Sequence, residues 1–240
     1  KGYFQVNRLL LGIEIDTMKR KKTQKAKGVV MMDKVLRLEN SFEVEVEEDA
    51  VVHVQLGWDM KRGGLKEKIE GQVAAAVIGI SEKGYDLNLA AIVEHDTQEA
   101  ELVFHHGPGG CGADRSGAVL LSKDDRSGFG GGSDEDLHVR LKEVPESVQR
   151  IVFFMNIGGA NVLDQHLTDV DNVFVQIQNE KNCRVYLREE EAFCCERAQE
   201  YCCYTFAELC RKGRGWVLHG VSRYSKEDSE LETMRAFCDR

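Results

Sequence analysis

An acid-rich loop with four glycines, residues 120–141, holds the side chains of this chain that are best suited to bind a cation. Glycine adopts positive φ angles without steric cost, so this backbone can fold back sharply and bring its carboxylates together. Carboxylate oxygens are the hard ligands that calcium prefers, and the loop offers Asp124, Asp125, Asp134, Glu135 and Asp136. Taken alone, however, the spacing favours a solvated hairpin tip, because it lacks the EF-hand order of acidic positions and a closing glutamate.

Four further segments occur in a fixed order around this loop. Upstream lie Leu-Gly-Trp-Asp at 56–59 and Asp-Leu-Asn-Leu-Ala-Ala at 86–91. Downstream lie Val-Pro-Glu-Ser-Val-Gln-Arg-Ile-Val-Phe at 144–153 and Phe-Ala-Glu-Leu-Cys-Arg at 206–211, followed by Trp216. In this order and at these separations, the segments resemble the TerD family, the calcium-binding domain of tellurium-resistance and stress-response proteins. The resemblance covers about residues 42–224.

The resemblance implies a calcium site at one end of a β-sandwich, built from three of these motifs. Carried over by position, its ligands are Asp59, Asp86, Asn88, Asp124, Asp134 and Glu135. This chain departs from the family pattern, because Gly84, Asn88, Gly131 and Ser133 stand where the family has Asp. Calcium affinity follows the number of charged ligands, so we expect weak binding, of one ion or of none. Asn88 and Ser133 can still offer neutral oxygens.

Three functions follow from these residues. The first is a non-enzymatic calcium-binding or stress-response module with a weakened site. The alternative is a scaffold or interaction subunit of a larger assembly that has lost most metal binding. The third is a metal-dependent hydrolase using a calcium-bound water, which the sequence disfavours because it has no nucleophile elbow, His-Glu-x-x-His motif or phosphate-binding loop.

The elements that must position the site are short strands with alternating apolar and polar residues. They are expected at 42–47, 51–58, 85–93, 101–104, 137–141, 151–157, 170–178, 183–187 and 216–221. We therefore predict an all-β, two-sheet β-sandwich with one or two short helices. One of these helices is expected in the last part of 189–210, where Phe206, Leu209 and Cys210 can share a stripe before a stop at Gly213.

Alternation also bears on the ligands. Asp86 and Asn88 lie two residues apart, so they share one face of their strand and are well placed for one cation. His105 and His106 are adjacent and would point to opposite faces, so we do not expect them to bind a metal as a pair.

The domain limits follow the alternating pattern. We expect a basic N-terminal extension at 1–41, the β-sandwich at 42–224 with an insertion at about 61–83, and a charged C-terminal tail at 225–240. The basic run within 19–27 could contact an acidic protein partner or, peripherally, a membrane surface, although a solvated face or a disordered arm is the commoner explanation of such a run.

Composition limits the remaining classes. A net charge of −9 and a pI of about 5.4 argue against a nucleic-acid binder, which needs basic residues to neutralise phosphates. No run reaches the roughly 18 apolar residues of a membrane span. The eight cysteines include adjacent pairs that do not form zinc knuckles, so we expect mostly buried thiols in the cytoplasm or another reducing compartment. The sequence begins at Lys1 rather than Met, so it gives no basis for a prediction of targeting.

Overall fold

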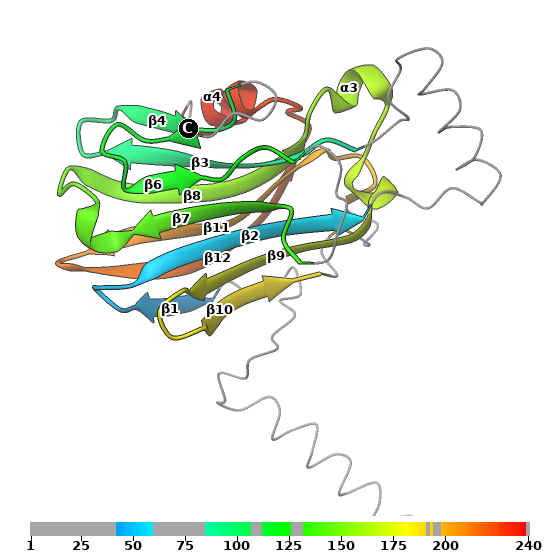
Figure 1. Ribbon diagram of the computed structural model, residues 1–240. Coiled ribbons are helices and arrows are strands. Elements are labelled where there is room, and N and C mark those ends of the chain that lie inside the picture. Colours follow the sequence, from blue (N-terminus) through cyan, green and yellow to red (C-terminus); the bar gives the residue numbers. More distant parts are fainter. Residues whose placement is uncertain are drawn as a thin grey trace, which may run out of the picture. The chain divides into compact units, whose positions relative to one another are not determined.

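Two antiparallel sheets pack face to face and enclose the core between them (Figure 1). The computed structural model describes residues 42–59, 85–106, 112–125, 132–190, 193 and 198–238. These residues belong to one unit, Val35–Arg240. The predicted all-β sandwich with one or two short helices is confirmed. The expectations for the basic extension and the insertion at 61–83 lie outside the described residues, and the domain limits stay predictions.

The first sheet has six strands, whose neighbours are all antiparallel. Their order is β1 (Glu43–Val46), β12 (Gly215–Ser225), β11 (Cys203–Lys212), β8 (Val148–Ile157), β3 (Leu87–His95) and β4 (Ala100–Val103). The second sheet also has six, in the order β10 (Arg184–Glu189), β9 (Asp171–Asn179), β2 (Val51–Asp59), β7 (Glu135–Arg140), β6 (Val119–Leu121) and β5 (Gly112–Ala113). Short helical segments complete the fold, namely α3 (Ala160–Leu163), α4 (Glu230–Cys238), η1 (Leu141–Glu143) and η2 (Leu167–Asp169).

The core follows from the period-two pattern of the second sheet. In β2, Val52, Val54 and Leu56 are fully buried, whereas His53 and Gln55 between them reach the outer face. Side chains alternate between the two faces of a strand, so one face of β2 packs on the first sheet and the other meets water. Trp58, expected in the core, is 3% exposed.

Strands β3 and β8 of the first sheet are apolar on both faces because both faces are covered. Ala90, Ile92, Val152 and Phe154 turn outward from the sandwich core into a second, smaller cluster. Phe237 of α4 completes that cluster, and α4 lies over β3 and β4 (Figure 1). A sheet covered on both sides produces continuous apolar runs such as 151–157.

The segment 225–240, predicted as a charged tail, contains α4. Thr233 and Phe237, four residues apart, are its buried side chains. Ser229 begins the helix, because its carbonyl accepts the Thr233 N–H at 3.0 Å and its hydroxyl accepts the Glu232 N–H at 3.4 Å. Because most residues of this segment are polar or charged, the sequence pattern did not indicate a packed helix. The two buried side chains are nevertheless enough for α4 to pack on the sheet.

The helix predicted near 206–210 is wrong. These residues belong to β11, which pairs with β8 on one side and with β12 on the other. A β-bulge between Thr205 and Ala207 shifts the register, so apolar residues follow one another at positions whose spacing mimics a helical stripe. Gly213, with φ of 64°, is the turn between β11 and β12 rather than a helix stop.

Five of the eight cysteines lie in the described residues, and all five are thiols: Cys183, Cys202, Cys203, Cys210 and Cys238. Cys202 and Cys203 are buried, Cys210 is half-buried, and Cys183 and Cys238 are exposed, so the expectation of mostly buried thiols is met only in part. Burial raises the pKa of Cys202 to about 12 and that of Cys203 to about 11, so both stay protonated and act as small apolar side chains.

None of the helices in the described part of the chain is long and apolar enough to cross a membrane.

Candidate metal centre

Strand ends carrying the predicted ligands meet at one end of the sandwich. β2 ends at Asp59, β3 begins directly after Asp86, and β7 begins at Glu135 (Figure 1). The segment 122–125, which includes Asp124, follows β6 at the same end, because β6 pairs with β7. The structure therefore gathers residues from four strand ends that are distant in sequence.

Glu135 is the residue around which this end is built. It starts β7 in the second sheet, yet its Oε2 accepts the main-chain N–H of Leu89 in the first sheet at 2.6 Å. Strand β4 pairs with β3 only as far as Ala91, so Glu135 supplies the acceptor beyond that point. The side chain is fully buried, and its other oxygen, Oε1, has no hydrogen-bond partner among the described residues.

The inner group consists of His105, Asp124 and Glu135. His105 Nδ1 lies 3.5 Å from Glu135 Oε1 and 3.8 Å from Asp124 Oδ1, and one ligand atom from each residue lies within 4.8 Å of the others. The side chains are 6%, 6% and 0% exposed. His105 Nε2 lies 3.2 Å from the carbonyl oxygen of Ser122. This contact assigns the ring proton to Nε2 and leaves the Nδ1 lone pair facing the two carboxylates.

When no cation is present, the surroundings favour the neutral forms of Glu135 and His105. Burial, with the carboxylates of Asp124 and Asp86 acting in the same direction, raises the pKa of Glu135 to about 9. Burial also lowers the pKa of His105. The pKa of Glu230 in α4 is raised by burial and then by Asp86 and Asp124, which shows that its carboxyl group faces the same field. A bound cation would offset this concentration of negative charge.

Three further carboxylates lie at this end, those of Asp59, Asp125 and Asp134, but within the described residues the convergence of ligand atoms to within 4.8 Å is found for His105, Asp124 and Glu135. Asp134 Oδ2 accepts the main-chain N–H of Trp58 at 2.8 Å, which ties the loop to the end of β2. Burial raises the pKa of Asp134, and the carboxylates of Asp125 and Asp59 act in the same direction. Asp59 Oδ2 accepts a hydrogen bond from Asn172 Nδ2 at 2.6 Å. Asn172 has a φ of 52°, so a left-handed residue aims this amide at the site.

Two residues predicted as neutral ligands make other contacts. Asn88 Nδ2 donates to the main-chain oxygen of Asp86 at 3.2 Å, and this amide lies against Gly158. Ser133 Oγ donates to Asp136 Oδ1 at 2.7 Å and accepts from Gln55 Nε2 at 3.2 Å. Because Glu135 and Asp136 are neighbours in a strand, Asp136 points to the outer face of the second sheet, and Ser133 follows it there.

His105 is the candidate ligand that sequence reasoning missed. We considered it only together with His106, whereas its partners Asp124 and Glu135 lie 19 and 30 residues further along the chain. The sequence offered one indication, a histidine directly after a predicted strand in a chain with predicted metal ligands. No sequence motif links His105 to Asp124 and Glu135, because only the fold brings these residues together.

Gly57 lets the loop approach β2. A Cβ atom at this position would lie 2.2 Å from the Phe174 ring and 2.7 Å from the carbonyl oxygen of Gly132. We expect Gly57→Ala to lower the free energy of unfolding by about 1–3 kcal/mol, because the extra methyl group would displace the Phe174 ring and the backbone at Gly132. The measurement is urea denaturation, with Gly215→Ala as control, since its Cβ would meet only Lys212 O at 3.9 Å. Equal stability of the two variants would contradict this role of Gly57.

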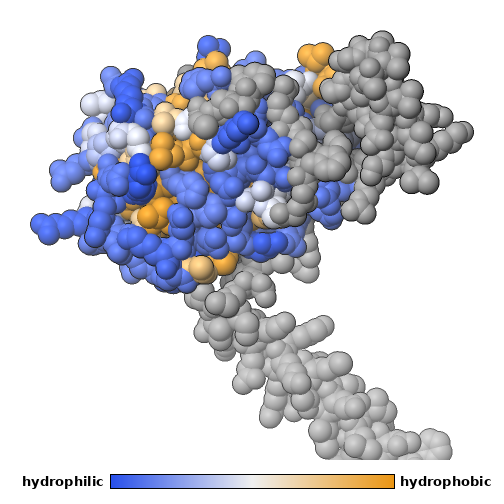
Figure 2. Space-filling view, viewed as in Figure 1, coloured by the Kyte–Doolittle hydropathy of each residue, from blue (hydrophilic) through white to orange (hydrophobic). Residues whose placement is uncertain are grey.

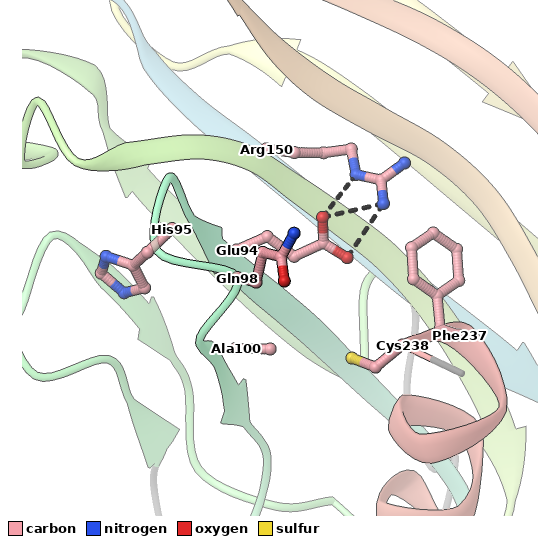
Figure 3. Close-up of a pocket in the computed structure, with 7 residues that line it drawn as sticks. All are labelled: Glu94, His95, Gln98, Ala100, Arg150, Phe237 and Cys238. Carbon is pink, nitrogen blue, oxygen red and sulfur yellow. Dashed lines mark hydrogen bonds and ion pairs between the residues drawn. The ribbon is translucent and has the colours of Figure 1, made fainter. Parts of the chain in front are cut away.

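A separate pocket of about 550 Å³ lies on the outer face of the first sheet, beneath α4 (Figure 3). Arg150 is its dominant charge, and its guanidinium contacts Glu94 at 2.8 Å and Glu208 at 3.4 Å. The same guanidinium lies 4.8 Å from the centre of the Phe237 ring. Two carboxylates and an aromatic ring thus engage the guanidinium of Arg150, and its contact with Phe237 links α4 to the sheet.

Comparison with known proteins agrees with this architecture. The TerD domain profile matches residues 33–235. The tellurium resistance protein TerX of Serratia marcescens is 28% identical over 205 residues, which cover 78% of this chain and 89% of that protein. General stress protein 16U of Bacillus subtilis is 35% identical over 77 residues, 32% of this chain and 40% of that protein.

A solved structure of a TerD homologue from Streptomyces coelicolor A3(2) superposes with a TM-score of 0.57 at 20% identity. The superposition covers 76% of this chain and 94% of that one, and it shows the shared fold. The family resemblance given by the sequence motifs is therefore confirmed. With its profile match across most of its length, the chain belongs to the TerD domain family.

Proposed function

We propose that this chain is a non-enzymatic TerD module of the resistance and stress-response type that binds a divalent cation, with calcium as the expected ion. The carboxylates in question are those of Asp59, Asp86, Asp124, Asp134 and Glu135. The observation that carries the proposal is the fully buried Glu135, whose Oε1 has no hydrogen-bond partner among the described residues and faces Asp124 and His105. A buried carboxylate oxygen in this position is costly unless a cation or proton compensates it.

The expected affinity for calcium is low. Calcium takes six to eight oxygen ligands, but the hydroxyl of Ser133 is already bound to Asp136 and Asn88 offers only a neutral amide oxygen. Water must replace the missing charged ligands, so the ion keeps more of its hydration shell and dissociates more readily. The names of the matched relatives are those of resistance and stress proteins and name no catalytic activity, which supports the non-enzymatic part of the proposal.

A thermal melting experiment tests the proposal. Calcium that binds only the folded chain stabilises it by RT ln(1 + [L]/Kd), which is about 1.4–2.7 kcal/mol at about 10 mM calcium for a Kd of about 0.1–1 mM. We therefore expect calcium to raise the Tm by roughly 3–10 °C. Asp134→Ala and Asp86→Ala should each abolish this rise. Asp96→Ala, which removes one exposed carboxylate in the turn after β3, is the control and should keep it.

One observation favours the alternative, a scaffold that has lost most metal binding. Val162 is 87% exposed and Leu163 is 48% exposed, and both belong to α3 at the end of β8. Figure 2 shows apolar surface over α3, at the upper right, and a larger apolar area in the left half of the same view. Exposed apolar side chains of this kind suit contact with a protein partner. If calcium leaves the Tm unchanged but Gly131→Asp with Ser133→Asp creates a response, the scaffold alternative is favoured.

A further inference from the structure

The inner group differs from an all-oxygen calcium site because one of its three ligand atoms is nitrogen. His105 Nδ1 faces Glu135 Oε1 at 3.5 Å and Asp124 Oδ1 at 3.8 Å, while its Nε2 contacts the Ser122 carbonyl at 3.2 Å. A histidine that binds a metal through one ring nitrogen usually donates from the other to a carbonyl or carboxylate, which fixes its tautomer and ring orientation. His105 has this arrangement.

The separations suit a small ion. Bonds of about 2.1 Å at a tetrahedral centre place neighbouring ligand atoms roughly 3.4 Å apart. The two separations from Nδ1 are close to this value, and no two of the three atoms are more than 4.8 Å apart. The three protein ligands leave a fourth position for water or another ligand, as catalytic and exchangeable zinc sites do.

Burial provides a second, independent indication of a ligand. Glu135 is fully buried, and its Oε1 lacks a hydrogen-bond partner among the described residues, as does His105 Nδ1. These two buried atoms face each other and Asp124, but neither forms a hydrogen bond with another described residue. A bound metal would satisfy both of them.

We propose that His105, Asp124 and Glu135 form a site for a borderline divalent metal of the zinc or cobalt type. Imidazole nitrogen with carboxylate oxygen suits such ions, whereas calcium takes oxygen ligands. The inference deepens the proposed cation-binding function and rests on it, because Asp124 and Glu135 belong to both. It names the class of ion that the buried part of the proposed site would take in preference to calcium.

Cobalt(II) titration of the metal-free chain under reducing conditions tests the proposal. We expect one tightly bound cobalt(II) with the visible absorption of low-coordinate cobalt and no near-ultraviolet thiolate band, because the ligands are nitrogen and oxygen rather than the cysteines. The Kd for cobalt(II) should be at least tenfold lower than that for calcium measured separately. His105→Asn should raise the cobalt(II) Kd at least tenfold and lower the ratio of cobalt to calcium affinity by a similar factor.

The neighbouring His106→Asn is the matched control, because His106 is exposed and should leave cobalt(II) binding unchanged. Circular dichroism of both variants shows whether they fold, and Asp124→Asn provides a second variant if His105→Asn does not. Cobalt(II) binding that is insensitive to both substitutions, or no tighter than calcium binding, would overturn the inference. A calcium response without selective cobalt binding rejects only the inference, whereas cobalt binding without a calcium response rejects only the proposed calcium function.

Discussion

Replacing Glu135 by alanine is expected to lower the free energy of unfolding by about 2–4 kcal/mol, whereas Glu135→Gln should be at least as stable as the unmutated chain. Glu135 is fully buried, and its Oε2 accepts the Leu89 N–H at 2.6 Å. Alanine leaves that N–H unsatisfied and creates a cavity between the sheets. Glutamine keeps the shape and an acceptor oxygen, and it removes a carboxyl group that burial disfavours as an anion.

Urea denaturation of both variants in a chelator measures this difference without a contribution from bound metal. Glu143→Ala is the control, because its carboxylate forms an exposed ion pair with Arg140 and should change stability by less than about 0.5 kcal/mol. Both Glu135 variants should lose the response of the Tm to cations. If alanine and glutamine at this position are equally stable, the hydrogen bond across the sandwich does not have the proposed importance.

The second large expected effect is a fall in the free energy of unfolding as the pH rises, and it arises from Glu189. It ends β10 and is 1% exposed, and burial raises its pKa from 4.5 to about 7 although it accepts a hydrogen bond from the Tyr204 hydroxyl at 2.6 Å. The folded pKa is above the unfolded one, so the native state favours the protonated form. The contribution is complete below about pH 4.5 and is lost as the pH rises through about 7, by about 2–3 kcal/mol.

Chemical denaturation of the unmutated chain and of Glu189→Gln at pH 5 and pH 8 tests this effect. Glutamine mimics the protonated form, so its stability relative to the unmutated chain should increase by about 2–3 kcal/mol between the two pH values. The difference isolates Glu189, because Glu135 contributes equally to both proteins. Glu190→Gln is the matched control, since Glu190 is the exposed neighbour paired with Arg188. A relative stability that stays constant with pH would contradict the assignment.

Alternation along single strands predicted most of the second sheet. Val52, Val54 and Leu56 alternate with polar residues, and each faces the core as expected. This pattern is local, so it can be seen in a sequence without knowledge of the partner strands. The motif Leu-Gly-Trp-Asp also predicted where β2 ends, and the structure places Asp59 there.

Features that depend on tertiary contacts were not predictable in this way. The bulge in β11 is set by pairing with β8 and β12, and it gave a strand the spacing of a helix. Helix α4 packs on a sheet surface that cannot be seen in the sequence. Its many charged residues therefore led to the prediction of a charged tail. Within the site, the sequence identified Asp124 and Glu135 as ligands, but only the fold brings His105 to them.

Isothermal titration calorimetry of calcium into the metal-free chain tests most directly whether this end of the sandwich binds a cation. We expect a saturable heat that corresponds to no more than one calcium ion per chain, with a Kd of about 0.1–1 mM, and its loss in Asp134→Ala. Asp96→Ala should retain the heat of the unmutated chain. An absence of binding heat in the unmutated chain, or an equal heat in Asp134→Ala, would contradict calcium binding at this site.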